Sequence, residues 1–196
     1  MIQLNLHVDA SCVSLFSPLL EKGVVIQTRT GCTLRDFLCG QLGLSGDYLD
    51  QRVQTLFLDA RPVDDVDTAV IRDGSTLALS AAMPGLLGAT MRKGGRYAAF
   101  RKDISQHTDE CGICEATGRV TVKLFNMVAR EVGGRLLEAG VEVDGSDLQR
   151  IADRYPEDLS RIIRKARMGD HEVTPDKSLF STLSKHRILL SVSIAK

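Results

Sequence analysis

The stretch LFLDARPVDDVDTAVIRDGSTLALSAA, residues 56 to 82, decides the fold prediction for the first half of the chain. It continues an apolar run, VQTLFLD (53–59), whose residue types favour a strand. ARPVDD indicates a turn that leads into a short strand, and the Asp-Gly pair at 73–74 marks a second turn. The alternating residues of DGSTLALSAA (73–82) then predict a final strand.

Three elements are predicted before this stretch. IQLNLHV (2–8) alternates apolar and polar residues, which is typical of a half-buried strand, and VVIQTRT (24–30) predicts a second strand. TLRDFLCGQLG (33–43) predicts a helix, since Thr33 and Asp36 have capping-box spacing. We therefore expect a hairpin, a helix that crosses one face, and returning strands in a mixed sheet.

This order of elements, together with the stretch 56–82, resembles the β-grasp fold of ubiquitin and of the sulfur carriers ThiS and MoaD. In the sulfur carriers a strand, a short hairpin, a loop and an aspartate-glycine turn lead into the last strand in a similar way. The resemblance covers residues 1–83. It implies a domain that presents a sheet face or edge to protein partners.

The second half of the chain is predicted to be mainly helical. Residues 119–131 place apolar side chains at helical spacing, and Gly133 and Gly134 are expected to end or bend that helix. Three further helices are predicted at DGSDLQRIADRY (144–155), PEDLSRIIRKARMG (156–169) and TPDKSLFSTLSKH (174–186), the last with Thr174 as its cap and Pro175 first.

The last segment, RILLSVSIA (187–195), alternates and predicts a strand. A single strand is not stable alone, so it needs the N-terminal sheet, an unrecognised strand or a second chain, which would make a homodimer. The predicted fold is thus α+β, with a β-grasp domain at 1–83, a glycine-rich basic connector at 84–118, and a mainly helical domain with a C-terminal strand at 119–196.

Composition is that of a globular protein, with 43% hydrophobic and 26% charged residues and no formal net charge. Residues 1–83 carry six basic and ten acidic side chains, and the remainder carries 19 and 15, so the second half has the more basic surface. No apolar run approaches the roughly 18 residues of a membrane span. MIQLNLHVDA has neither a basic nor a continuous apolar segment, so we expect a cytoplasmic protein with reduced cysteines.

The connector contains the segment MPGLLGATMRKGGRYAAF (83–100), which has four glycines, three basic residues and no acid. Ubiquitin-like carriers end in Gly-Gly, so the resemblance implies a carrier tail here if the chain is cleaved after Gly95, although 101 residues follow it. Alternatively, residues 85–102 contact phosphate or nucleic acid through basic and aromatic side chains. The candidate binding residues are Arg92, Lys93, Gly94, Gly95, Arg96 and Tyr97.

The segment HTDECGIC offers a candidate zinc site. His107, Cys111 and Cys114 supply three ligand types that zinc prefers, and a fourth ligand has to come from elsewhere, such as His171 or His186. A thioredoxin-like redox pair is the alternative, although no buried strand is predicted before the first cysteine. Two free thiols in the connector are the third interpretation, and it requires no cofactor.

The sequence lacks Gly-x-Ser-x-Gly, Gly-x-Gly-x-x-Gly and His-Glu-x-x-His motifs, and no tight group of acids suggests a catalytic site. We therefore predict a non-enzymatic protein-interaction or adaptor module. The alternatives are a carrier cleaved after Gly95 and an anion or nucleic-acid binder that uses residues 85–102.

Overall fold

The structure is a computed structural model that describes residues 1–9, 14–83, 85–97, 116–156 and 161–194. In this part of the chain, helices alternate with ten strands that pair in both parallel and antiparallel fashion, which confirms the α+β class. The chain forms two compact units. The split unit comprises Met1–Val25 and Arg130–Lys196, and the continuous unit comprises Ile26–Ala129.

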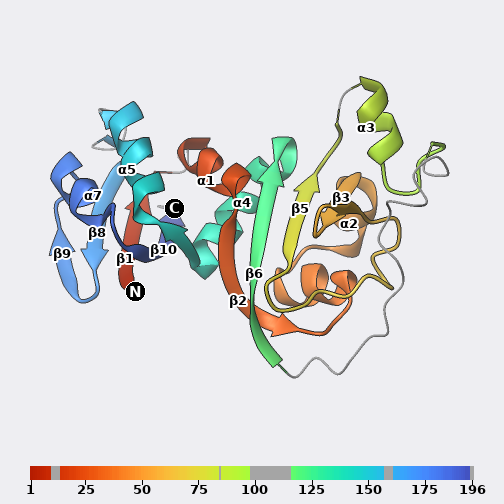
Figure 1. Cartoon of the computed structure of the whole chain (residues 1–196). Helices are drawn as coiled ribbons and strands as arrows, with labels where there is room; N and C mark the ends of the chain where they lie inside the picture. Colours follow the sequence, from red (N-terminus) through yellow and green to blue (C-terminus); the bar gives the residue numbers. More distant parts are fainter. Residues whose placement is uncertain (10–13, 84, 98–115, 157–160, 195–196) are drawn as a thin grey trace. The chain divides into compact units, whose positions relative to one another are not determined.

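The continuous unit contains a sheet with the strand order β4-β3-β5-β6-β2 (Figure 1). Strands β5 and β6 are parallel, whereas β3 pairs antiparallel with both β4 and β5. The elements are β2 (Val24–Thr30), the π-helix η2 (Asp36–Gln41), α2 (Gly46–Gln51), β3 (Thr55–Leu58), β4 (Arg61–Pro62), β5 (Thr76–Ser80), α3 (Gly85–Met91) and β6 (Ala116–Phe125).

The stretch 56–82 folds as a hairpin and a returning strand that are held together by one aspartate. Asp59 accepts hydrogen bonds from the backbone N–H of Thr76 (2.7 Å) and from the hydroxyl of Ser75 (3.1 Å). Asp73, at the second turn, accepts from the N–H of Arg119 at 2.7 Å, which fixes the start of β6 beside β5. The turn chemistry of this stretch therefore sets the register of the central strands.

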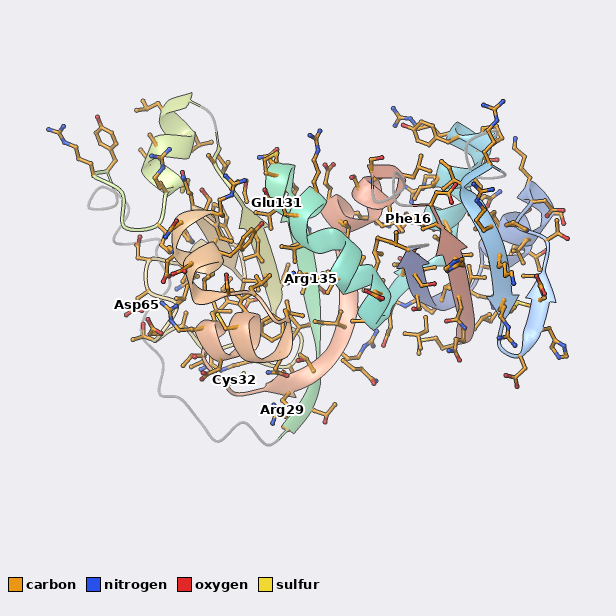
Figure 2. The ribbon with its side chains drawn as sticks, turned by 180° about the vertical axis from the view of Figure 1, so that it is seen from behind. Phe16, Arg29, Cys32, Asp65, Glu131 and Arg135 are labelled. Atoms are coloured by element: carbon orange, nitrogen blue, oxygen red, sulfur yellow. The ribbon has the colours of Figure 1, made fainter. Side chains whose placement is uncertain are left out.

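The strands of this sheet have one buried and one half-open face. Leu56, Leu77 and Val122 are fully buried, whereas the residues that follow them, Phe57 and Ala78 among others, are only half-buried. Helices η2 and α2 lie over the buried face, in front of the strands when the molecule is viewed from behind (Figure 2). The alternate side chains therefore form a second face that these helices do not cover.

The split unit contains strands in the order β7-β10-β1-β8-β9, and the first residues of β2 join it through Val25 opposite Glu142. β10 runs parallel to β1, and the other pairs of this unit are antiparallel. Its elements are β1 (Ile2–Val8), α1 (Ser17–Lys22), β7 (Val141–Asp144), α5 (Gly145–Arg154), β8 (Ile163–Met168), β9 (His171–Val173), α7 (Lys177–Leu183) and β10 (Arg187–Ile194), and α4 (Asn126–Ala139) enters it from the continuous unit.

The predicted hairpin of the first two strands is wrong. Both strands exist, but β1 pairs with β10 and β8, while β2 lies next to β6 and β7. The connection between them contains helix α1, so it is not a tight turn. The end of β2 lies beside the start of β6, because the hydroxyl of Thr30 donates to the carbonyl oxygen of Ala116 (3.1 Å).

Two segments that were predicted to be helical in the C-terminal part are strands instead. Residues 119–125 belong to strand β6, whose alternation of buried Val120, Val122 and Leu124 is the strand period rather than the helical one. Likewise, Ile163–Met168 is a strand because it pairs with β1 and β9. Gly133 and Gly134 lie inside α4 and do not end it.

Two other predictions for this half are confirmed in part. α5 and α7 are present, but the cap of α7 is Asp176, which accepts from the N–H of Leu179 (2.9 Å), and not Thr174. The terminal strand is confirmed as β10, and it pairs with β1 on one side and β7 on the other. Pairing within the chain removes the reason for expecting a dimer through this strand.

The two units do not coincide with the predicted boundaries at residues 83 and 119. The first strand of the chain belongs with the C-terminal elements, and β6, which follows the connector, belongs with β2 and β5. Long-range strand pairing produces this arrangement, and the chain passes between the units within β2 and α4.

Candidate functional site

The candidate site lies on the half-open face of the continuous unit. In the antiparallel pair of β3 and β5, Thr55 is opposite Ser80 and Phe57 is opposite Ala78. In the parallel pair of β5 and β6, Ala78 aligns with Lys123. Because successive side chains of a strand point to opposite faces, these residues share one face of the sheet.

This face contains a hollow of about 370 Å³. Its volume is at the lower end of the range found for small-ligand pockets, so it accommodates one large side chain or a small molecule. The lining is predominantly apolar and comprises Thr55, Phe57, Ala78, Leu79, Ser80, Met83, Phe125 and Asn126.

Two buried hydroxyl groups occur at the end of this hollow. The Ser80 hydroxyl accepts a hydrogen bond from the side-chain amide of Asn126 (3.1 Å). The Thr55 hydroxyl is buried, and no hydrogen-bond partner for it is found among the described residues. A buried hydroxyl without a partner is costly, so Thr55 is expected to destabilise this part of the sheet.

A single cation adjoins the hollow. Lys123 is half-buried beside Ala78, and no carboxylate pairs with it in the part of the chain that the structure describes. An apolar hollow with one hydroxyl and one ammonium at its border suits an apolar side chain that has a carboxylate nearby.

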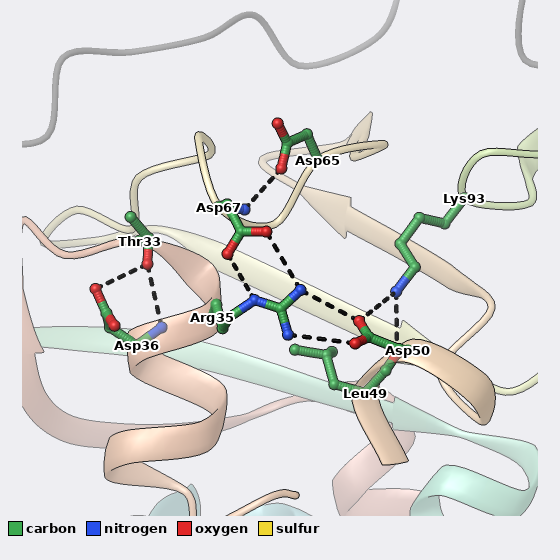
Figure 3. Close-up of polar contacts among 8 residues, drawn as sticks. All are labelled: Thr33, Arg35, Asp36, Leu49, Asp50, Asp65, Asp67 and Lys93. Carbon is green, nitrogen blue, oxygen red and sulfur yellow. Dashed lines mark hydrogen bonds and ion pairs between the residues drawn. The ribbon is translucent and has the colours of Figure 1, made fainter. Parts of the chain in front are cut away.

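The sequence-predicted residues of the connector lie elsewhere in this unit. Lys93 is anchored by its ammonium, which donates to the carbonyl oxygen of Leu49 (3.0 Å) and lies 3.8 Å from a carboxylate oxygen of Asp50 (Figure 3). Burial lowers the pKa of Lys93. The N–H of Gly94 donates to the carboxylate of Asp64 at 3.1 Å. This end of the connector is therefore fastened to the folded unit.

The other candidate residues of the connector form a more open group. Arg92, Arg96 and Tyr97 are exposed, and the N–H of Gly95 donates to the carbonyl oxygen of Arg92 at 3.1 Å. Gly94 has a φ of +58°, which glycine adopts without strain, so this glycine is required for the turn. These residues make a short basic turn next to the anchored lysine.

In the same region, Arg35 connects helix α2 with the loop that contains Asp67. Arg35 forms a two-pronged contact with Asp67, with Nε at 2.6 Å and Nη2 at 3.2 Å from its oxygens, and a second contact with Asp50 (Figure 3). These hydrogen bonds raise the pKa of Arg35. Thr33 accepts from the N–H of Asp36 at 3.1 Å, which confirms the predicted cap of the first helix. We interpret this network as structural, because the charges of Arg35, Asp67 and Asp50 are paired with one another.

The candidate zinc or redox residues His107, Cys111 and Cys114 lie outside the described residues. Within the described ranges, no group of three or more His, Cys, Asp or Glu side chains is arranged to hold a metal ion. Among the same residues, no helix has the length and apolar character needed to cross a membrane.

Comparison with known proteins gives no relative from which a function can be transferred. No protein-family model matches the chain, no curated protein matches it, and no solved structure matches it. The function is therefore argued from the site itself.

Sequence reasoning missed the sheet-face site. Its members are small, aromatic or hydroxyl residues at every second position of three strands, and only the pairing of those strands brings them together. The usable signal was the set of alternate positions that are not leucine or valine, namely Thr55 and Phe57 in β3 and Lys123 and Phe125 in β6. Residues 119–125 of β6 were predicted to be helical, so their alternation was not interpreted as that of a strand.

Proposed function

We propose that this protein is a non-enzymatic interaction module whose continuous unit, a β-grasp-like domain, binds an apolar side chain of a protein partner on its open sheet face. The observation that carries the proposal is the hollow of about 370 Å³ between β3, β5 and β6. Phe57 and Phe125 supply aromatic walls, and aromatic residues are enriched at protein interfaces.

The β-grasp comparison rests on the strand order and on the helix side of the sheet. The neighbour of β2 in the sheet of this unit is β6, a strand that follows the connector, and not β1, which precedes β2. In this interpretation, the residues expected to form a complete β-grasp domain at 1–83 contribute all but one strand, and the missing strand comes from 116–125. The domain is then a β-grasp-like fold in which β6 takes the place expected for β1.

The partner is expected to present an apolar anchor next to an acidic residue. Lys123 is the neighbour on β6 of Ala78, which lines the hollow, and it is the cation that such an acid would meet. Complementary charge at the border of an interface contributes to orientation and association rate more than to affinity.

Site-specific photocrosslinking tests this proposal in cells of the native host. The photoreactive residue p-benzoyl-phenylalanine replaces Phe57 or Phe125, with Gln51 on α2, an exposed residue of the helix side, as the control position. We expect a discrete adduct from both sheet-face positions, absent from the control, whose partner peptide contains an apolar residue beside Asp or Glu.

Ala78→Glu places a charge in the hollow and should abolish the adduct, and Lys123→Glu should weaken it. The absence of any adduct, or an adduct that also forms from Gln51, would reject the proposal. An adduct of twice the chain mass would assign the face to a second copy of this chain instead.

This interaction function is favoured over a carrier cleaved after Gly95. Lys93 and Gly94 are bonded to Leu49 and Asp64, and a tail that enters an adenylating enzyme has to release both contacts. The intact mass of protein purified from its own host separates the two functions. A single species at 21.4 kDa supports the interaction module, and a fragment ending at Gly95 supports the carrier.

A further inference from the structure

The split unit has a second hollow, between helices α1 and α5, that the proposed interaction function does not use. Its volume is about 320 Å³, and it lies on elements that contact each other within one unit. Its lining residues come from two short segments of sequence and are Pro18, Leu19, Lys22, Asp147, Arg150, Ile151, Arg154 and Tyr155.

One buried carboxylate positions two cations at this hollow. Asp147 is buried, with 9% of its side chain exposed, and its two oxygens lie 2.5 Å from Lys22 Nζ and 2.5 Å from Arg150 Nη2. Lys22 comes from α1 and Arg150 from α5, so Asp147 holds together cations of two helices. Because Asp147 already holds these two long side chains in place, they lose less conformational entropy when a ligand binds.

A third cation, Arg154, lies at the same hollow. Arg154 lies one turn after Arg150 on α5, and its guanidinium carbon is 5.4 Å from the ring centre of Tyr155. Among the described residues no carboxylate pairs with Arg154. The lining of the hollow therefore has three cations and one carboxylate, a positive excess opposite in sign to the charge of a phosphate monoester near neutral pH, and Asp144, outside the lining, lies 3.9 Å from Lys22.

The remainder of the lining is apolar. Leu19 and Ile151 are buried at 3% and 4% exposure, and Pro18 and the Tyr155 ring border them. Such a surface does not bind a bare inorganic ion better than water does, but it does bind an apolar or aromatic group attached to that ion. Arginine side chains meet phosphate oxygens in a two-pronged geometry, and a tyrosine ring stacks on flat groups.

We propose that this hollow is a binding site for a small phosphate monoester that carries an apolar or aromatic group. The phosphate lies between Arg150, Arg154 and Lys22, and the organic group lies against Leu19 and Ile151. The site is independent of the sheet face of the continuous unit and of the basic turn at Arg92–Tyr97, so its test does not depend on the interaction function.

The test is a titration of the full chain with phenyl phosphate, followed by isotope-edited NMR and by calorimetry. We expect chemical-shift changes centred on α1 and α5, with inorganic phosphate and benzoate each binding at least about fivefold more weakly, because each lacks either the organic group or the second negative charge. Arg154→Gln should weaken phenyl phosphate binding about tenfold, since among the described residues its guanidinium lies over the Tyr155 ring and is paired with no carboxylate.

Lys185→Gln removes the same charge from an exposed position of the same unit and should leave the affinity unchanged. Tyr155→Leu keeps the apolar bulk but removes the stacking surface, and should weaken phenyl phosphate while leaving inorganic phosphate unaffected. The proposal is overturned if phenyl phosphate does not bind, if it binds no better than inorganic phosphate, or if Lys185→Gln weakens it as much as Arg154→Gln does.

Discussion

Thr55 and Ser80 lie directly opposite each other across the β3–β5 ladder, but only one of their hydroxyl groups is hydrogen-bonded within the described residues. Ser80 accepts from Asn126, the residue that starts α4 with a φ of +54°. Thr55 is 1% exposed and has no such partner. The sheet face thus holds one satisfied and one unsatisfied hydroxyl at the hollow where we place a protein partner.

Thr55→Val tests the cost of this unsatisfied hydroxyl. Valine has the same shape without the polar group, so we expect the free energy of unfolding to rise by about 1 kcal/mol. Urea denaturation followed by circular dichroism measures the change. Thr28→Val is the matched control, because the Thr28 hydroxyl donates to Gln41 at 2.5 Å and its loss should destabilise the protein. A destabilised Thr55→Val variant would show that the Thr55 hydroxyl has a partner.

The two faces of β3 should differ in their contribution to stability. Leu56 is fully buried on the helix side, so Leu56→Ala should lower the free energy of unfolding by about 3 kcal/mol. Phe57 is half-buried on the open face, and Phe57→Ala should cost about 1 kcal/mol. Urea denaturation of both variants gives the comparison. A larger loss for Phe57→Ala would mean that the hollow belongs to the core and is not free for a partner.

The anchoring of Lys93 should protect the connector from proteolysis. Lys93→Met keeps the aliphatic chain but removes the hydrogen bond to Leu49, which is worth about 1 kcal/mol and corresponds to roughly fivefold more local opening. Limited digestion with subtilisin, with cleavage sites located by mass spectrometry, should show about fivefold faster cleavage within residues 92–97. Arg96→Met is the control, since Arg96 is exposed. Equal rates in the two variants would contradict the anchoring.

Acid should remove the contribution of Asp144 to stability. Arg187 donates to its carboxylate at 2.8 Å and lowers the pKa of Asp144. A carboxyl group whose pKa is lower in the folded state stabilises the fold above its unfolded pKa, about 3.9, and loses that effect as pH falls through the folded value. Asp144→Asn should therefore be less stable than the native chain at pH 7, by at most about 1 kcal/mol because the pair is partly exposed.

This difference should shrink between about pH 4 and pH 2, as both proteins then lack the charge. Urea denaturation at pH 7, 5 and 3 measures it, with Asp170→Asn, at an exposed turn of the same unit, as the control. A gap that stays constant with pH would assign the effect to packing and not to charge.

Gly145 should not tolerate a side chain. The N–H of Gly145 donates to the carbonyl oxygen of His186 at 2.9 Å, and a Cβ atom would lie 1.9 Å from the carbonyl oxygen of Leu183. Gly145→Ala therefore forces the start of α5 away from the end of α7, and we expect a loss of about 1–3 kcal/mol in unfolding free energy. Gly40→Ala, where no atom lies within 4 Å of the new carbon, should be neutral or slightly stabilising in thermal denaturation.

Much of the local structure could be predicted from the sequence. The alternating residues of IQLNLHV and RILLSVSIA gave the strands Ile2–Val8 and Arg187–Ile194, and Thr33 with Asp36 gave the start of the first helix. These predictions succeed because side-chain period, turn residues and caps act within a few residues of one another. The same local signals were misread at 119–125 and 163–168, where mixed apolar and charged residues fit a helix as well as a strand.

By itself, the sequence determined which segments are strands at both ends of the chain and where the turns between residues 56 and 82 fall. Only the tertiary structure decided that β1 pairs with β10, 186 residues further along, and that β6 completes the sheet of β2, β3 and β5. Strand partners are chosen by the burial of whole faces and by backbone hydrogen bonds between distant segments, and neither is encoded in a local pattern. Both hollows follow from those choices, because each is lined by residues that lie together only after the elements have packed.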